Sequence, residues 1–147
     1  MSTSNISLET THRVRDHCLC LHAQRAARSL ARRFDEALRP VGLTNGQFSL
    51  LMALNRPEPP SMGSVATLLA MDRTTLTANL KPLDRRGLLA TTVDRADRRE
   101  RRLSLTEAGR ELLRSATPIW ERAHEQTEAV LGSAEADRLR AGLRALS

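Results

Sequence analysis

The sequence predicts a mainly α-helical fold with one small β-hairpin, and two observations lead to this prediction. Apolar residues recur at steps of three and four over most of the chain, which is the spacing of amphipathic helices. The exception is residues 88–105, where two short β-prone segments flank an arginine-rich segment. A chain of 147 residues, 40% of them hydrophobic, is long enough for one domain with a modest core.

The N-terminal part of the chain is predicted to form one long helix, from about Leu8 to Leu38. Its apolar residues form a single stripe at helical spacing: Leu19, Ala23, Ala27, Leu30, Phe34, Ala37 and Leu38. Pro40 and Gly42 follow this stripe, and both residue types commonly end helices. The segment is therefore expected to be helical up to the proline.

Three shorter helices are predicted next. Thr44 with Gln47 has the spacing of a capping box, which begins a second helix. After the loop RPEPP at 56–60, Ser61 can cap a third helix, and Asp72 can cap a fourth over 73–86 that Gly87 ends. The expected inward residues of these helices are Phe48, Leu51, Leu54, Met62, Val65, Ala66, Leu69, Leu76, Leu80 and Leu83. Pro82 is expected to bend the fourth helix.

A hairpin and two further helices complete the prediction. Residues 88–93 and 101–105 read as strands, and the arginine-rich segment between them would be the tip of the hairpin. Thr106 can cap a fifth helix that runs to Leu131 and that Pro118 should bend. Ser133 is expected to cap a sixth helix, with Leu139, Leu143 and Leu146 along one side.

Two short helices, a tight turn, a further helix and a basic hairpin together make a winged helix-turn-helix. A helix of this kind fits the major groove of duplex DNA, and an arginine-tipped hairpin can reach phosphates or the minor groove. The net charge of +6 and the pI of about 11.0 also favour a polyanionic partner. Residues 72–102 carry a net charge of +4, from nine basic and five acidic side chains, whereas residues 106–147 carry −1, from six and seven.

Composition also disfavours several classes of function for this chain. There is no tyrosine and one tryptophan, so stacking of single-stranded nucleic acid on aromatic side chains is not expected. No apolar run of 18 residues predicts a membrane span, and the N-terminal residues lack the apolar core of a signal peptide. Two closely spaced cysteines fit a reducing compartment. We therefore expect a cytoplasmic protein without a membrane partner.

Three segments resemble the MarR-type (multiple-antibiotic-resistance) transcriptional regulators. They are GLTNGQFSLLMAL, SVATLLAMDRTTLTANLKPLDRRGLL and DRADRRERRLSLTEAGREL, which together run from Gly42 to Leu112. The resemblance implies a homodimer that dimerises through its N- and C-terminal helices and binds a pseudo-palindromic operator. Residues 1–43 and 106–147 would then form the helical dimerisation region, and residues 44–105 the winged helix-turn-helix DNA-binding region of a single domain.

The resemblance also assigns roles in the hairpin. It places Arg99 in the minor groove, braced by an ion pair with Asp97, while Arg98 and Arg95 would contact the DNA backbone. In the fourth helix, the residues that lie off the leucine stripe are the expected DNA contacts: Arg73, Thr74, Thr75, Thr77, Ala78 and Lys81. The alternatives are a solvated charge run on the hairpin and an exposed, threonine-rich helix face without a reading role.

The segment HCLCLH, residues 17–22, contains a second group of reactive side chains. The resemblance includes organic-hydroperoxide sensors with a reactive cysteine in the first helix, and the spacing to GLT places Cys20 there. Those sensors hold the thiolate with tyrosine hydroxyls, whereas the matching residues here are Phe34 and Asn45. Cys18 and Cys20 could therefore be redox sensors, or buried structural residues. A metal site is the third alternative, formed by His17, Cys18 and His22, with His12 or a partner chain's His124.

The predicted function is sequence-specific binding of duplex DNA by a transcriptional regulator, with a repressor favoured. A small ligand or thiol oxidation would release it, and an aromatic or anionic ligand could lie near Phe34 and Phe48. No enzymatic activity and no cofactor are expected. The alternatives are a thiol-dependent enzyme that uses Cys18 or Cys20, and an architectural protein that binds DNA without sequence preference.

Overall fold

A computed structural model describes residues 5–147, and its internal contacts divide the chain into two units, up to Arg33 and from Phe34 to Ser147. The first unit contains α1 (Leu8–His17) and most of α2 (Leu19–Leu38). The prediction of one uninterrupted helix was wrong, because Cys18 has an extended backbone, with ψ of 110°. Its N–H still bonds to the carbonyl oxygen of Val14, and its Sγ accepts from the Leu21 N–H at 3.5 Å, so Cys18 ends α1 and caps α2.

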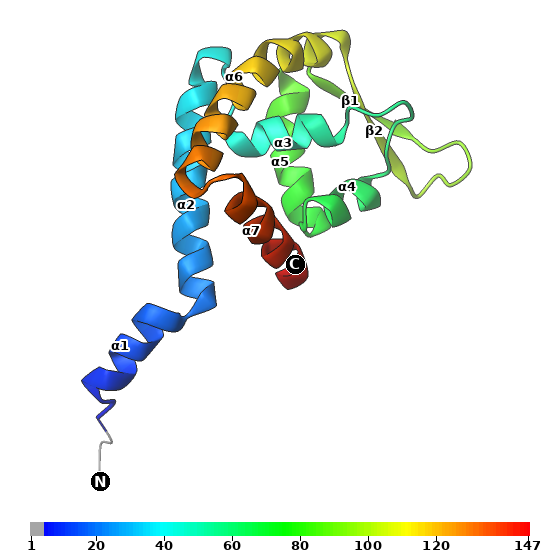
Figure 1. Ribbon diagram of the computed structural model, residues 1–147. Coiled ribbons are helices and arrows are strands. Elements are labelled where there is room, and N and C mark those ends of the chain that lie inside the picture. The colour runs from blue at the N-terminus through cyan, green and yellow to red at the C-terminus, as the bar shows by residue number, and fades with distance from the viewer. Residues whose placement is uncertain (1–4) are drawn as a thin grey trace. The chain divides into compact units, whose positions relative to one another are not determined.

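The second unit begins with the end of α2 and contains the winged fold (Figure 1). A short 3-10 helix, η1 (Arg39–Val41), leads to Gly42, whose φ of 70° turns the chain toward α3 (Asn45–Ala53). The capping box of Thr44 and Gln47 is confirmed in both directions. Asp35, in α2, accepts hydrogen bonds from the backbone and side-chain N–H groups of Asn45, which fixes where α3 begins.

The next two helices form the helix-turn-helix. Ser61 caps α4 (Met62–Leu68) by accepting from the Ser64 N–H, as predicted. Asp72 caps α5 (Arg73–Arg85) by accepting from the Thr75 N–H at 2.7 Å. The helix continues through Pro82 to Arg85, and Gly87 then adopts a φ of 70°. Side-chain caps therefore fix where both helices begin.

The hairpin consists of β1 (Leu89–Val93) and β2 (Arg101–Leu105), which pair antiparallel with Leu89 opposite Leu105 and Val93 opposite Arg101. The loop before α4 also pairs with β2, because the Leu103 N–H donates to the Pro60 carbonyl oxygen and Ser61 forms an isolated bridge with Arg102. In Figure 1 the tip of the hairpin extends beyond the helices of this unit. The wing is thus anchored at its base.

Two helices end the chain. Thr106 caps α6 (Glu107–Leu131), as predicted, and Pro118 lies inside this helix. The predicted cap of α7 (Ser133–Leu146) was wrong: Gly132, with φ of 85° and ψ of 153°, is the cap residue, and Ser133 is already helical. A glycine can adopt this positive φ without strain, so the chain turns at Gly132 without a side-chain cap.

The core of the second unit is made mostly of leucines, which come from α2, α3, α5, β1, β2 and α6. The largest fully buried side chains are Leu38, Leu50, Leu51, Leu76, Leu83, Leu103 and Val65. By contrast, several large apolar side chains in α1, α2, α6 and α7 are exposed: Leu8, Val14, Leu19, Leu30, Val130, Leu131, Leu139, Leu143 and Leu146. None of the helices in residues 5–147 combines the length and the apolar character that crossing a bilayer requires.

Candidate nucleic-acid interface

One face of α5 is buried and the opposite face is open to solvent. Leu76, Leu80 and Leu83 are buried, as the periodicity predicted. The predicted contact residues of this helix are all exposed: Arg73, Thr74, Thr75, Thr77, Ala78 and Lys81. The helix α5 is the second helix of the helix-turn-helix. With this polar, partly cationic face it has the form needed to enter a major groove.

The hydroxyl groups of this face are partly committed within the helix. The Thr75 hydroxyl donates to an oxygen of Asp72 at 3.0 Å, and the Thr77 hydroxyl donates to the Arg73 carbonyl oxygen at 2.8 Å. The two hydrogen bonds from Thr75, with the backbone bond first, lower the pKa of Asp72 below its usual range. Thr75 and Thr77 therefore remain available mainly as acceptors and as methyl groups, both of which base edges can use.

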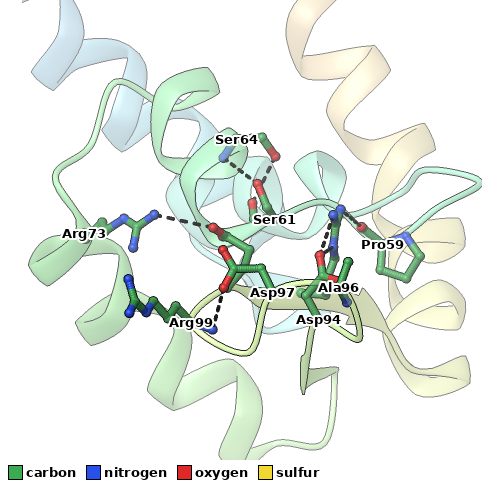
Figure 2. Close-up of polar contacts among 10 residues, drawn as sticks. Pro59, Ser61, Ser64, Arg73, Asp94, Ala96, Asp97 and Arg99 are labelled. Carbon is green, nitrogen blue, oxygen red and sulfur yellow. Dashed lines mark hydrogen bonds and ion pairs between the residues drawn. The ribbon is translucent and has the colours of Figure 1, made fainter.

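The loop at the tip of the wing is closed by its own acidic residues (Figure 2). The Asp94 N–H donates to the Glu100 carbonyl oxygen, and the Glu100 N–H donates to the Asp97 carbonyl oxygen. The Asp94 carboxylate accepts from the Ala96 N–H at 2.8 Å and from the Arg102 Nε at 2.9 Å. Arg102 also donates to the Pro59 carbonyl oxygen, so the base of the wing is tied to the loop before α4.

The expected ion pair between Asp97 and Arg99 is replaced by a backbone contact. The Asp97 carboxylate accepts a hydrogen bond from the Arg99 N–H at 3.0 Å, as Figure 2 shows. It therefore braces the backbone of the loop and does not pair with the Arg99 guanidinium. Aspartate two residues before an N–H commonly makes this turn, which competes with a side-chain pair. Asp97 therefore supports Arg99 through the backbone.

The three arginines at the wing tip carry charge that the described carboxylates leave unpaired. Arg95, Arg98 and Arg99 are exposed, and no ion pair joins them to an acidic side chain of residues 5–147. Arg102, which is also in the wing, differs because Asp94 pairs with it at 2.8 Å. The tip is thus a local concentration of positive charge next to the exposed face of α5, as binding to a phosphate-lined groove requires.

The sequence patterns did not single out two residues that belong to this site. Arg102 anchors the wing, and its place in β2 beside the buried Leu103 was the available signal. One oxygen of Glu100 lies 3.9 Å from Nη2 of Arg73, the first residue of α5. No local pattern reveals that contact, because the two residues lie far apart in the sequence.

The brace at Asp94 predicts how the wing responds to acid. The Ala96 N–H and then Arg102 lower the pKa of Asp94 below its ordinary value. Because the folded pKa is depressed, the stabilisation is complete above the ordinary pKa and is lost as pH falls through the lower one. An NMR titration of the Ala96 amide should therefore have a midpoint below about pH 3.9, and Asp94→Asn should remove it. A midpoint at or above that pH would contradict the brace.

The two cysteines lie in the first unit, at the break between the helices. Cys18 is half-buried and caps α2, whereas Cys20 is exposed and its Sγ lies 3.4 Å from Nε2 of Gln24. His22 Nδ1 lies 2.8 Å from the carbonyl oxygen of Cys18, which favours the Nδ1–H tautomer. No three histidine, cysteine or acidic side chains within residues 5–147 are grouped to hold a metal ion.

An apolar cavity of about 360 Å³ lies beside α3 and α6. Its lining residues are Phe48, Ser49, Met52, Ala53, Leu68, Leu69 and Trp120. Phe48 stacks on Trp120 with ring centroids 6.0 Å apart, and Trp120 stacks on His124 at 4.6 Å. Phe34 packs against His124 and is not among the lining residues. Of the two aromatic residues predicted near a ligand, only Phe48 lines this cavity.

The fold agrees with comparisons to known proteins. A model of the MarR family matches residues 41–100. The transcriptional regulator MosR of M. tuberculosis, solved in complex with DNA, is 38% identical, with a TM-score of 0.78 over 86% of this chain and 93% of that one. The transcriptional repressor CouR, bound to a 23-mer DNA duplex, is 28% identical, with a TM-score of 0.81 over 97% and 99%.

Curated relatives are matched over shorter lengths. The transcriptional activatory protein BadR of Rhodopseudomonas palustris is 36% identical over 77 residues, which are 50% of this chain and 44% of that protein. Other curated relatives are matched over as much as 64% of their length, so the chain spans only about half to two thirds of them. From the matched family model and the close likeness to MosR along its length, the chain belongs to the MarR family of transcriptional regulators.

Proposed function

We propose that this protein is a sequence-specific duplex-DNA-binding transcriptional regulator. The observation that carries the proposal is the pairing of an exposed polar face on α5 with three arginines at the wing tip that lack carboxylate partners among the described residues. The helix would read base edges, with Lys81 and Ala78 facing the bases and Thr74 near a phosphate. Arg99 would enter the minor groove, with Arg95 and Arg98 on the backbone.

We also infer that the DNA-binding form is a homodimer. The exposed apolar residues of α1, α2, α6 and α7 form two sets, in residues 1–43 and 106–147, that a second copy of the chain would cover. Two winged regions, residues 44–105 of each copy, would then bind half-sites about 10 bp apart on a pseudo-palindromic operator. Dimerisation would thus supply most of the discrimination between the operator and other DNA sequences, because each half-site alone is short.

Repression is the direction of regulation that we favour, since a dimer bound across a promoter excludes other proteins from it. A small aromatic or anionic effector would occupy the cavity beside Phe48 and Trp120, whose stacked rings suit a planar ligand. The cavity borders α3 and α6, so a ligand there would change the packing of the helices that support the helix-turn-helix. An aromatic acid that releases the protein from DNA would support this assignment, and Trp120 fluorescence would report its binding.

Oxidation of the cysteines is the second route of release that we propose. Cys18 is half-buried and caps α2, whereas Cys20 is exposed and is therefore the thiol that oxidant should reach first. We expect organic hydroperoxide to weaken DNA binding of the wild type and of Cys18→Ser, but not of Cys20→Ser. Band-shift titrations with mass spectrometry of the thiols would test this. Full DNA affinity in all three proteins with modified thiols would make the cysteines structural.

A regulator of this kind works on chromosomal DNA, so we infer a cytoplasmic location. We likewise infer that the protein is not an enzyme and needs no cofactor for DNA binding. A thiol-dependent enzyme using Cys18 or Cys20 would turn over a peroxide catalytically in the absence of DNA. Measuring peroxide consumption by the purified protein tests that alternative directly, with Cys18→Ser and Cys20→Ser as controls.

The experiment that tests the proposed function is sedimentation of the protein with a labelled duplex from the DNA flanking its own gene. We expect a dimer at micromolar concentration in the absence of DNA, and two chains per bound duplex. A scrambled duplex of equal length and composition should bind far more weakly, by roughly a factor of a thousand or more. A monomer on DNA would contradict the dimer, and equal binding of both duplexes would favour an architectural protein.

A further inference from the structure

Three segments meet at the Arg73 side chain, where α5 begins. One oxygen of the Glu100 carboxylate, at the end of the wing loop, lies 3.9 Å from Arg73 Nη2, as drawn in Figure 2. On the α4 side, a Cβ built at Gly63 would lie 3.1 Å from the same Nη2. The guanidinium therefore lies close to the α4 backbone at a residue that has no side chain. Arg73, the first residue of α5, therefore joins this helix to both α4 and the wing.

The position of Glu100 is energetically unfavourable for a carboxylate. Its side chain is only 26% exposed, and its Oε1 is buried and accepts no hydrogen bond from the described residues. A buried carboxylate oxygen without a donor costs free energy, and the ion pair to Arg73 compensates only in part at 3.9 Å. Glutamine or an apolar residue would be less costly for folding. The carboxylate is thus not explained by the stability of the wing.

Glu100 also opposes DNA binding by simple electrostatics. It is an acid between the exposed arginines of the wing tip and the cationic start of α5, on the side that would meet phosphates. Long-range attraction alone would be stronger without it. A benefit to DNA binding must therefore come from the local contact with Arg73.

We propose that Glu100 is a positioning residue for DNA recognition, which holds the Arg73 guanidinium between α5 and the wing. Arg73 is 64% exposed on its side chain and has five N–H donors, so a carboxylate contact leaves donors for a backbone phosphate. One side chain would then join the wing, the recognition helix and the DNA, and would set the spacing at which both elements enter their grooves. This inference rests on the proposed function, because it assumes that the protein binds a specific duplex.

The test compares Glu100→Gln with the wild type on two probes. One probe is a duplex selected with the wild-type protein from a random-sequence pool, and the other is its scrambled counterpart. We expect Glu100→Gln to bind the selected duplex about fivefold more weakly, although the protein has lost a negative charge. Binding to the scrambled duplex should be unchanged or tighter, so the ratio of the two affinities should fall. The matched control, Glu111→Gln, removes the same charge from a side chain on α6 that is 72% exposed, and should keep that ratio.

A double-mutant cycle separates positioning from a general loss of structure. Arg73→Gln should weaken binding to the selected duplex, and adding Glu100→Gln should cause little further loss, because the two residues act through one contact. The melting temperature of Glu100→Gln should be unchanged or higher, since a poorly satisfied charge is removed. Gly63→Ala, which displaces the guanidinium while leaving Glu100 in place, should give the same loss of the affinity ratio.

Unchanged or tighter binding of Glu100→Gln to the selected duplex would overturn the inference alone, and so would additive losses in the cycle. A lower melting temperature that parallels the loss of affinity in every variant would also overturn it, in favour of a structural role. A different failure, in which the wild-type protein selects no preferred duplex, would overturn the proposed function and this inference together.

Discussion

Replacing Gly109 by alanine should cost about 3 kcal/mol or more of unfolding free energy. A Cβ at this position would lie 2.1 Å from the Leu88 carbonyl oxygen and 3.2 Å from Cδ2 of Leu105. The neighbours cannot move easily, because the same carbonyl oxygen accepts from the Thr106 N–H and the Thr106 hydroxyl donates to the Gly87 carbonyl oxygen at 2.6 Å. The methyl group would therefore push the start of α6 away from Leu88, the residue before β1.

Urea unfolding followed by circular dichroism measures this effect. Gly46→Ala is the matched control, because it adds a methyl group at an exposed position in α3. The new Cβ there would meet no atom beyond its own stretch of helix within 4 Å, so the change should be neutral or stabilising. The loss should be confined to Gly109→Ala. Equal stability of the two variants would mean that α6 can shift away from the wing without cost.

Removing the three arginines of the wing tip together should weaken operator binding about a hundredfold or more. In a triple Arg95→Ala, Arg98→Ala, Arg99→Ala variant, a bound dimer loses six arginines. The slope of log affinity against log salt should therefore flatten by roughly 5.4, because each phosphate that an arginine no longer neutralises accounts for about 0.9. The fold should be unaffected, because these side chains are exposed and Asp97 braces the backbone and not the guanidinium of Arg99.

The control for this variant removes equal charge from exposed arginines of α6 and α7, at Arg114, Arg138 and Arg144. It should lower the affinity much less, because those arginines lie away from the wing tip in the sequence and Arg114 and Arg138 already have carboxylate partners. Equal effects of the two triple variants would show that the wing-tip arginines are a solvated charge run without a specific role in DNA binding.

Lys81→Ala should instead change the preference between operator variants if Lys81 faces a base.

The helix starts could be predicted from the sequence because capping is local. Thr44, Ser61, Asp72 and Thr106 each lie within three residues of the N–H that they accept from. The break at Cys18 was missed because it has no glycine or proline to mark it, and the cysteine acts as the cap. At α7, glycine and serine stand side by side as candidate caps, and the preference for serine gave the wrong residue.

The exposed face of α5 could be predicted for a similar reason, since three leucines at helical spacing define the buried side. The internal bracing of the wing could not. Arg102 reaches the Pro59 carbonyl oxygen, 43 residues away, and Glu100 reaches Arg73 across two elements. The ion pair predicted from the family resemblance, between Asp97 and Arg99, was replaced because a turn brings the Arg99 N–H within 3.0 Å of the carboxylate.

The central claim, that two copies of the chain read a specific duplex through α5 and the wing, is tested most directly by footprinting. Purified protein would be added to the DNA that flanks its gene, and both strands would be cleaved by hydroxyl radicals. We expect protection of two half-sites about 10 bp apart, related by an inverted repeat, with protection in the adjacent minor grooves that disappears in the triple arginine variant. Uniform protection along the whole fragment, or a single protected half-site, would contradict the account.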